Sequence, residues 1–199
     1  MKRDARATRQ RILGAATAEF SQYGLAGARV DRVAAASGSN KAMIYAYFGS
    51  KEGLFEAVGE ALVTWHLNEV PLDASDLPGY AARVFDRYQQ HPELMRLVGW
   101  DRLERGGVGG QAPGMIETAQ GKIEAIRRAQ EAGLIDGHFP APILFELMLA
   151  LIELRVYTAD SQDERALTER RNAVRDAVAR LVEVRSPARP AGTSTRWEE

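Results

Sequence analysis

Residues 24–55 read GLAGARVDRVAAASGSNKAMIYAYFGSKEGLF and decide the fold of the first part of the chain. Two short helical patterns lie on either side of a turn at residues 37–40. Gly38 can adopt the left-handed conformation that ends a helix, and the side chain of Asn40 can accept a hydrogen bond from the first amides of the next one. Two helices joined by such a turn are typical of a helix-turn-helix, and this motif predicts DNA binding.

The two helical patterns also have distinct faces. The first has apolar or small residues at the spacing i, i+3, i+4 and i+7, namely Val30, Val33, Ala34 and Ser37. In the second, Ile44 and Phe48 lie four residues apart and are expected to face inward. The opposite side, which can approach a DNA groove, then carries Lys41, Ala42, Tyr45 and Ala46.

Residue chemistry suggests roles on that exposed side. Lys41 can reach a phosphate or a guanine edge, and the Tyr45 hydroxyl can donate to a phosphate. Ala42 and Met43 are candidates for contact with a thymine methyl group. The alternatives are that Lys41 is a solvated lysine and that Tyr45 covers the core of a small domain.

A further helix is expected after Ser50, which can cap it. Lys51 opens this helix, where its charge and the free amides could hold a phosphate together. The alternative for Lys51 is a solvated side chain with no role.

Residues 40–55, NKAMIYAYFGSKEGLF, resemble the recognition helix and following turn of the TetR family of bacterial transcription regulators. The resemblance extends upstream to residues 9–16, to Glu19-Phe20 and to Tyr23-Gly24, and it covers about a quarter of the chain. It implies that Tyr47 contacts a phosphate, unless it is a half-buried core aromatic. It also suggests a backbone contact for Arg29, from its position ahead of the second helix. The chain departs from the usual pattern at Ala28-Arg29, Ser39, Asn40 and Ala42, so no operator sequence can be transferred.

The distribution of charge supports a DNA-binding head. The 199 residues have a net charge of −1, but residues 1–51 hold nine basic and three acidic residues, a net charge of +6. The remainder has a net charge of −7. A basic module followed by an acidic one is expected for a DNA-binding head on a sensing or oligomerising body.

Composition argues against several other classes of protein. The chain has no cysteine, so disulfides and thiolate metal sites are excluded. Its three histidines, at positions 66, 91 and 138, have no metal-ligand spacing, and no motif of an enzyme, metal site or cofactor is found. No secretory signal or membrane span is recognisable, so we expect a cytoplasmic protein.

Past the head, the pattern predicts a helical body over residues 52–184. Helices are expected from Ser50 to about Trp65, from Tyr80 to Gln90, from Pro92 to near Arg105 and from Met115 to Ala132. Residues 105–114 are expected to form a loop, and residues 185–199 a disordered tail. The predicted domains are therefore the head at 1–51, the body at 52–184 and the tail.

The last two predicted helices suggest how the protein assembles. Residues 143–157 are apolar nearly all round, and in the final helix Leu167, Val174 and Leu181 recur every seven residues. They could simply form the core of a monomer. In the family that the sequence resembles, however, these helices pair with their symmetry mates, and a two-fold homodimer suits a palindromic site.

A small-molecule effector pocket in the body is implied by the resemblance alone. Its candidate lining residues are Phe85, Tyr88, Met95, Leu97, Trp100 and Leu103. Aromatic residues at helical spacing are also what an ordinary core contains. Nothing in the pattern identifies the effector.

The sequence thus predicts an all-α protein of about nine helices, with a three-helix helix-turn-helix domain followed by a helical effector-binding and dimerisation domain. The expected function is that of a transcriptional regulator, with repression favoured, which binds a palindromic operator as a dimer and is released by an effector. The alternative is an all-helical interaction or structural module without specific DNA binding, which would leave the basic head unexplained.

Overall fold

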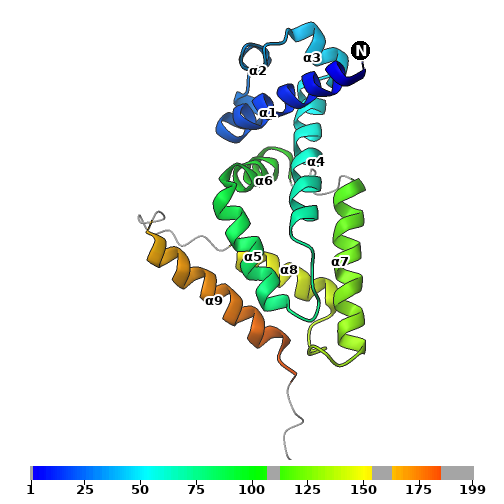
Figure 1. The fold of residues 1–199 in the computed structure, drawn as a ribbon, viewed down its shortest axis with the longest axis vertical. Coiled ribbons are helices and arrows are strands. Elements are labelled where there is room, and N and C mark those ends of the chain that lie inside the picture. Colours follow the sequence, from blue (N-terminus) through cyan, green and yellow to red (C-terminus); the bar gives the residue numbers. More distant parts are fainter. Residues whose placement is uncertain (1, 107–112, 154–162, 185–199) are drawn as a thin grey trace, which may run out of the picture.

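The computed structural model describes residues 2–106, 113–153 and 163–184, and all regular structure in this part of the chain is helical. The helices are α1 Lys2–Gly27, α2 Val30–Ser37, α3 Lys41–Phe48, α4 Lys51–Glu69, α5 Leu77–Gln90, α6 Pro92–Arg105, α7 Pro113–Glu131, α8 Ala141–Ile152 and α9 Glu164–Val182. Figure 1 shows α1–α3 gathered at one end of an elongated molecule, with α4 running from this head into the body. The predicted all-α fold with an N-terminal helix-turn-helix is confirmed.

The head has its own hydrophobic core. Its largest fully buried side chains are Ile12, Phe20, Val33, Ile44, Leu54 and Val58. The rings of Phe20 and Phe55 meet edge to face with their centroids 5.1 Å apart. Since Leu54, Phe55 and Val58 come from α4, the core of the head extends beyond residue 51, where the sequence-based boundary was drawn.

The turn between α2 and α3 has the predicted chemistry. Gly38 ends α2 in the left-handed conformation, with φ 63°, and Ser39 donates its amide to the carbonyl of Ala34. The Asn40 side chain caps α3 by accepting a hydrogen bond from the amide of Met43 at 2.8 Å. Ser50 caps α4 in the same way, through the amide of Gly53 at 3.0 Å. Local side-chain and backbone preferences therefore end α2 and begin α3 at this turn.

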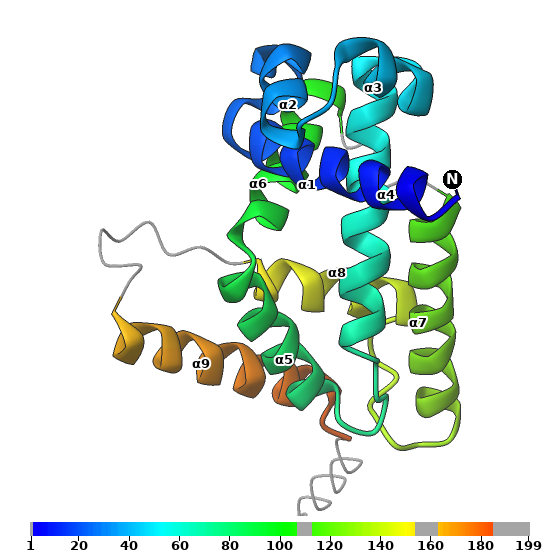
Figure 2. The ribbon, with the colours of Figure 1, turned by 45° about the horizontal axis from the view of Figure 1, so that its top comes forward.

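The body is a second packed layer of helices. Its core is built from α5, α7, α8 and α9, and its largest fully buried side chains are Leu77, Tyr80, Ile126, Leu144, Met148 and Val178. In Figures 1 and 2, α9 lies beside α5 and α7 lies beside α4. Arg171 of α9 donates to both carboxylate oxygens of Asp86 on α5, at 2.8 Å each, which fixes the register of this pair.

Helix α6 joins the body to the head by packing against α1. The indole of Trp100 donates to the carbonyl of Ser21 at 3.2 Å. The Glu104 carboxylate accepts the amides of Leu25 and Ala26, at 2.6 and 3.1 Å. These bonds converge on the kink of α1 at Gly24, whose φ of 68° and ψ of −177° are not helical. Gly24 thus ends the regular part of α1.

Several helix boundaries differ from those predicted for the body, and α7 runs over Pro113–Glu131 rather than from Met115 to Ala132. Helix α5 begins at Leu77 rather than Tyr80, because Asp76 caps it by accepting the amide of Gly79. Helix α8 begins at Ala141 rather than Ile143, with Pro142 within its first turn. The predicted tail, most of the loop at 105–114 and the end of the helix predicted to reach residue 157 lie outside the described residues. Within the described part, no helix has the length and apolar character needed to cross a membrane.

Candidate nucleic-acid interface

Helix α3 presents one exposed face, formed by most of its side chains. Ile44 alone among its residues is buried, and Phe48 is half-buried against the core of the head. Met43, Tyr45 and Tyr47 keep 39, 42 and 38% of their surface exposed. Lys41, Ala42 and Ala46 are exposed as well. Large apolar and aromatic groups left in solvent on one short helix indicate a contact surface.

Lys41 stands at the first position of α3 and forms an ion pair with the preceding helix. Its ammonium lies 2.7 Å from a carboxylate oxygen of Asp31 on α2. The hydrogen bond and the charge of Asp31 raise the pKa of Lys41. Both side chains are more than half exposed, so water and salt screen the pair and a phosphate could replace the carboxylate.

Tyr45 and Tyr47 are the aromatic part of this face. The ring of Tyr47 lies 6.1 Å from that of Phe48, so it continues the surface toward the C-terminal end of α3. Both tyrosines project from the recognition helix itself, where a hydroxyl could donate to a phosphate.

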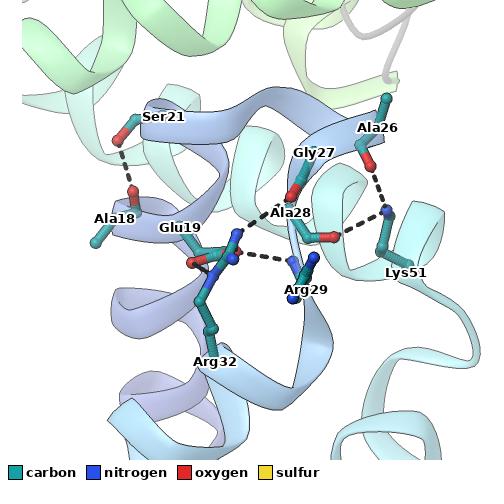
Figure 3. Close-up of polar contacts among 9 residues, drawn as sticks. All are labelled: Ala18, Glu19, Ser21, Ala26, Gly27, Ala28, Arg29, Arg32 and Lys51. Carbon is teal, nitrogen blue, oxygen red and sulfur yellow. Dashed lines mark hydrogen bonds and ion pairs between the residues drawn. The ribbon is translucent and has the colours of Figure 1, made fainter.

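Arg29 precedes α2 and Lys51 begins α4, and the two differ in what they bind within the protein (Figure 3). The Arg29 amide donates to Glu19 at 2.8 Å, and its side chain is exposed. The Lys51 ammonium donates to the carbonyls of Ala26 and Ala28, at 3.2 and 3.0 Å. Lys51 therefore ties α4 to the segment between α1 and α2, which sequence reasoning did not foresee.

Glu19 is a structural residue of the interface that sequence reasoning missed. It is buried, and it accepts the Arg29 amide together with Nε of Arg32, at 2.7 and 2.9 Å. Burial raises the pKa of Glu19, but the hydrogen bonds from Arg32 and the Arg29 amide, with the charges of both arginines, outweigh it and lower the pKa overall. Figure 3 shows this carboxylate between α1 and the start of α2. The available signal was that Glu19 is one of only three acids in the basic first 51 residues.

Comparison with known proteins agrees with this geometry. Residues 12–58 match the family model "Bacterial regulatory proteins, tetR family", and residues 76–180 match "Tetracyclin repressor-like, C-terminal domain". The chain is 41% identical over 152 residues to the HTH-type transcriptional repressor SCO4008 of Streptomyces coelicolor, which covers 75% of this chain and 78% of that protein. The chain belongs to the TetR family of bacterial regulatory proteins.

Two further relatives support membership of the TetR family. The HTH-type transcriptional repressor NicS of Pseudomonas putida is 32% identical over 139 residues, or 66% of each chain. The crystal structure of SCO4942 from S. coelicolor, described as a transcriptional regulator, superposes with a TM-score of 0.77 at 36% identity, over 89% of this chain and 99% of that one. Since TetR regulators are DNA-binding proteins and not enzymes, the chain is a DNA-binding regulator.

The residues proposed for a TetR-type effector pocket lie in three different surroundings. Phe85 is buried in the core of the body, and Tyr88 packs against that core. Burial raises the pKa of Tyr88 to about 12. Leu97 instead belongs to the core of the head.

The other three, Met95, Trp100 and Leu103, line an open hollow of about 340 Å³ between α1 and α6, together with Ser21, Gln22, Arg96 and Gly99. Leu103 is 80% exposed. Phe85, Tyr88 and Leu97 are not among the residues that line this hollow.

No metal centre is evident in the described part of the chain, where no three potential ligands among His, Asp and Glu come together.

Proposed function

We propose that this TetR-family regulator is a repressor that binds a palindromic operator as a homodimer and leaves it when a small-molecule effector binds the body. The observation that carries the proposal is the exposed face of α3, held by a capped turn on a head of net charge +6. We expect the protein to act in the cytoplasm, where bacterial DNA lies.

At DNA, α3 would enter the major groove with its exposed face toward the bases. Lys41, Ala42 and Met43, in its first turn, would contact base edges or nearby phosphates. Tyr45 and Tyr47 would contact the sugar-phosphate backbone from the later turns.

Arg29 and Lys51 would mark the border of the contact. The Arg29 side chain is exposed, so a phosphate can reach it. For Lys51, the amides at the start of α4 are the better phosphate ligand, because its ammonium already donates to two carbonyls.

The homodimer would form through α8 and α9. One side of α8 is used in the core of the monomer, through Ala141, Leu144, Phe145, Met148 and Ile152. Its other side carries Ile143, 45% exposed, together with Glu146 and Ala150, which are also exposed. A largely apolar helix that the described residues cover on one side only is suited to pairing with a second copy.

Effector release would work through a shift between two arrangements of the dimer. Helix α6 packs between the body and α1 and binds the backbone of α1 through Trp100 and Glu104. An effector that preferred another position of α6, near Tyr88 or the α1–α6 hollow, would move the two recognition helices out of register with successive major grooves.

Repression is favoured because both of the named curated relatives are transcriptional repressors, at 41 and 32% identity.

Selection of binding sites from a random duplex pool by the purified protein tests the proposal. We expect enrichment of a palindrome whose complex contains an even number of protomers, measured by light scattering. Enrichment of an asymmetric site bound by one protomer would contradict the dimer, and no enrichment would contradict sequence-specific binding.

A further inference from the structure

The first ten residues of α1, 2–11, form a basic extension that the core of the head does not need. They include Lys2, Arg3, Arg6, Arg9 and Arg11, against the single acid Asp4. The first buried side chain of the helix is Ile12. The match to the family's DNA-binding model also begins at residue 12, so the extension lies outside it.

Three arginines of this extension, Arg6, Arg9 and Arg11, are exposed, and none has an ion pair among the described residues. Arg11 donates only to Thr8, at 3.2 Å. By contrast, Arg32 and Lys41 are paired with Glu19 and Asp31. Exposed arginines of the head without an ion pair are therefore found mainly at the start of α1, with Arg29 as the further one.

The extension is held beside the recognition helix. The guanidinium of Arg9 lies over the ring of Phe48, the last residue of α3, 5.3 Å from its centroid. In both ribbon views the N-terminal end of α1 lies on the same side of the head as α3 (Figures 1 and 2). Phe48 in turn adjoins Tyr47, so Arg9 continues the exposed face of α3.

Helical geometry sets the reach of the extension. Lys2, Arg6 and Arg9 occupy positions i, i+4 and i+7, which share one face of a helix. From Arg9, which lies at Phe48, back to Lys2 the helix rises about 10 Å, comparable to the ~12 Å width of a major groove. A stripe of that length starting beside the last residue of α3 would reach from the groove occupied by α3 to the phosphates at its edge.

We propose that Arg6 and Arg9 form a second DNA-binding element, which contacts backbone phosphates flanking the operator half-site read by α3. This inference rests on the proposed DNA-binding function. Its ligand is the phosphate backbone, so it adds affinity and salt dependence without reading sequence. The flanking duplex, rather than the operator core, is what it recognises.

The test compares two duplexes that carry the selected operator, one with long flanks and one trimmed at the operator ends. Fluorescence anisotropy measures the affinity of each against salt concentration for the parent and for an Arg6→Ala, Arg9→Ala double variant. On the long duplex we expect the log–log salt slope of the variant to be smaller by about 2 per protomer, since each neutralised phosphate contributes about 0.9. On the trimmed duplex, parent and variant should differ much less.

Two further variants control for charge and for folding. An Arg83→Ala, Arg127→Ala variant loses the same charge from exposed positions on α5 and α7, and its slope should match the parent. An Arg6→Lys, Arg9→Lys variant keeps the charge and should keep most of the slope. Thermal unfolding of each variant checks that loss of the Arg9–Phe48 contact has not unfolded the head.

The outcomes separate this inference from the proposed function. Equal slopes for parent and Arg6→Ala, Arg9→Ala on the long duplex would overturn the inference and leave operator binding intact. An equal decrease in salt slope for the Arg83→Ala, Arg127→Ala variant would also overturn the inference, because the effect would then depend on the net charge of the protein and not on the position of the arginines. A parent without salt-dependent duplex binding would overturn both. If only binding to anionic phosphatidylserine vesicles depended on Arg6 and Arg9, the stripe would belong to a membrane surface instead.

Discussion

The ammonium of Lys41, at the start of the recognition helix, lies 2.7 Å from the carboxylate of Asp31 on the helix before it. The pair places one of the few acids of the head directly on the surface expected to meet DNA. Without DNA, Asp31 holds Lys41 and lowers the positive potential of this surface. With DNA, a phosphate or a guanine edge would have to compete with Asp31 for the same ammonium.

An Asp31→Asn substitution should therefore strengthen binding to DNA of arbitrary sequence by a few-fold. The reason is that it removes a like-charge repulsion with phosphates and frees Lys41. The ratio of operator to non-specific affinity should fall, because the gain does not depend on sequence. Competition binding with operator and scrambled duplexes measures this ratio, and a ratio that rose would show that Asp31 does not oppose DNA.

Substitution of Gly24 should destabilise the protein strongly. Its φ of 68° and ψ of −177° lie in a region that only glycine adopts readily, and an added Cβ would come within 2.6 Å of Glu104 and 2.7 Å of Trp100. We expect Gly24→Ala to lower the free energy of unfolding by about 3 kcal/mol. Chemical denaturation followed by circular dichroism measures the change.

Two other glycines provide matched controls for Gly24. Gly38 also has a positive φ, 63°, but a Cβ there would meet nothing within 4 Å, so Gly38→Ala should cost only about 1 kcal/mol. Gly14 lies within helix α1 with equally open surroundings, so Gly14→Ala should stabilise the protein by about 0.5–1 kcal/mol. If all three substitutions changed the free energy of unfolding equally, the close approach of α6 to Gly24 would make no contribution to stability.

Glu19 should make the stability of the head depend on pH in the acidic range. Because the pKa of Glu19 is lower in the folded protein than its ordinary value of 4.5, its contribution is present above that pH and is lost as pH falls through the folded pKa. Glu19→Ala should lower stability at neutral pH by about 2 kcal/mol, since it leaves the Arg29 amide without its acceptor. Thermal unfolding of parent and variant between pH 7 and pH 3 should show the two curves converging.

The control for Glu19 is Asp31→Asn, which removes a carboxylate that is 69% exposed. It should change stability little at any pH, because exposed ion pairs contribute little. A Glu19→Ala variant as stable as Asp31→Asn would refute the role given to Glu19.

Lys122 should make stability rise in alkali. It is buried on α7, and its ammonium donates to the Tyr80 hydroxyl at 2.7 Å. Burial lowers the pKa of Lys122 to about 8, below its ordinary value of 10.5, so the unfolded chain binds the proton more tightly than the folded one. Between pH 8 and pH 10 the parent should therefore gain about 2 kcal/mol of stability.

A Lys122→Met variant isolates this effect. Its methionine side chain cannot titrate. The free energy of unfolding of the parent, measured by urea denaturation, should therefore increase relative to that of the variant from pH 8 to pH 10. The range stops at pH 10 because burial raises the pKa of Tyr80 above its ordinary value of 10, and stability from this group is lost at higher pH. A difference that stayed constant would mean that Lys122 is solvated in the folded protein.

Local signals in the sequence predicted the head well. Gly38, Asn40 and Ser50 act through bonds to residues at most five positions away, so their roles can be inferred from spacing. The same reasoning missed Asp76 as the cap of α5 and therefore began that helix three residues late.

Contacts between residues distant in sequence could not be predicted in this way. Lys51 binds carbonyls 23 and 25 residues earlier in the chain, and Glu104 binds amides 78 and 79 residues earlier. The different surroundings of the proposed pocket residues could not be predicted for a similar reason. Helical spacing places Phe85 and Leu103 on apolar stripes, but only the packing of α5, α6 and α1 decides that one is core and the other is exposed.

The most direct test of the central claim is the salt dependence of operator binding by the parent and by a Lys41→Ala, Tyr45→Ala variant. If α3 is the recognition helix, the affinity of the parent falls steeply as salt rises, and the variant loses both its preference for the operator and part of that slope. An unchanged operator preference in the variant, with both proteins folded, would contradict the assignment of α3 as the element that reads DNA.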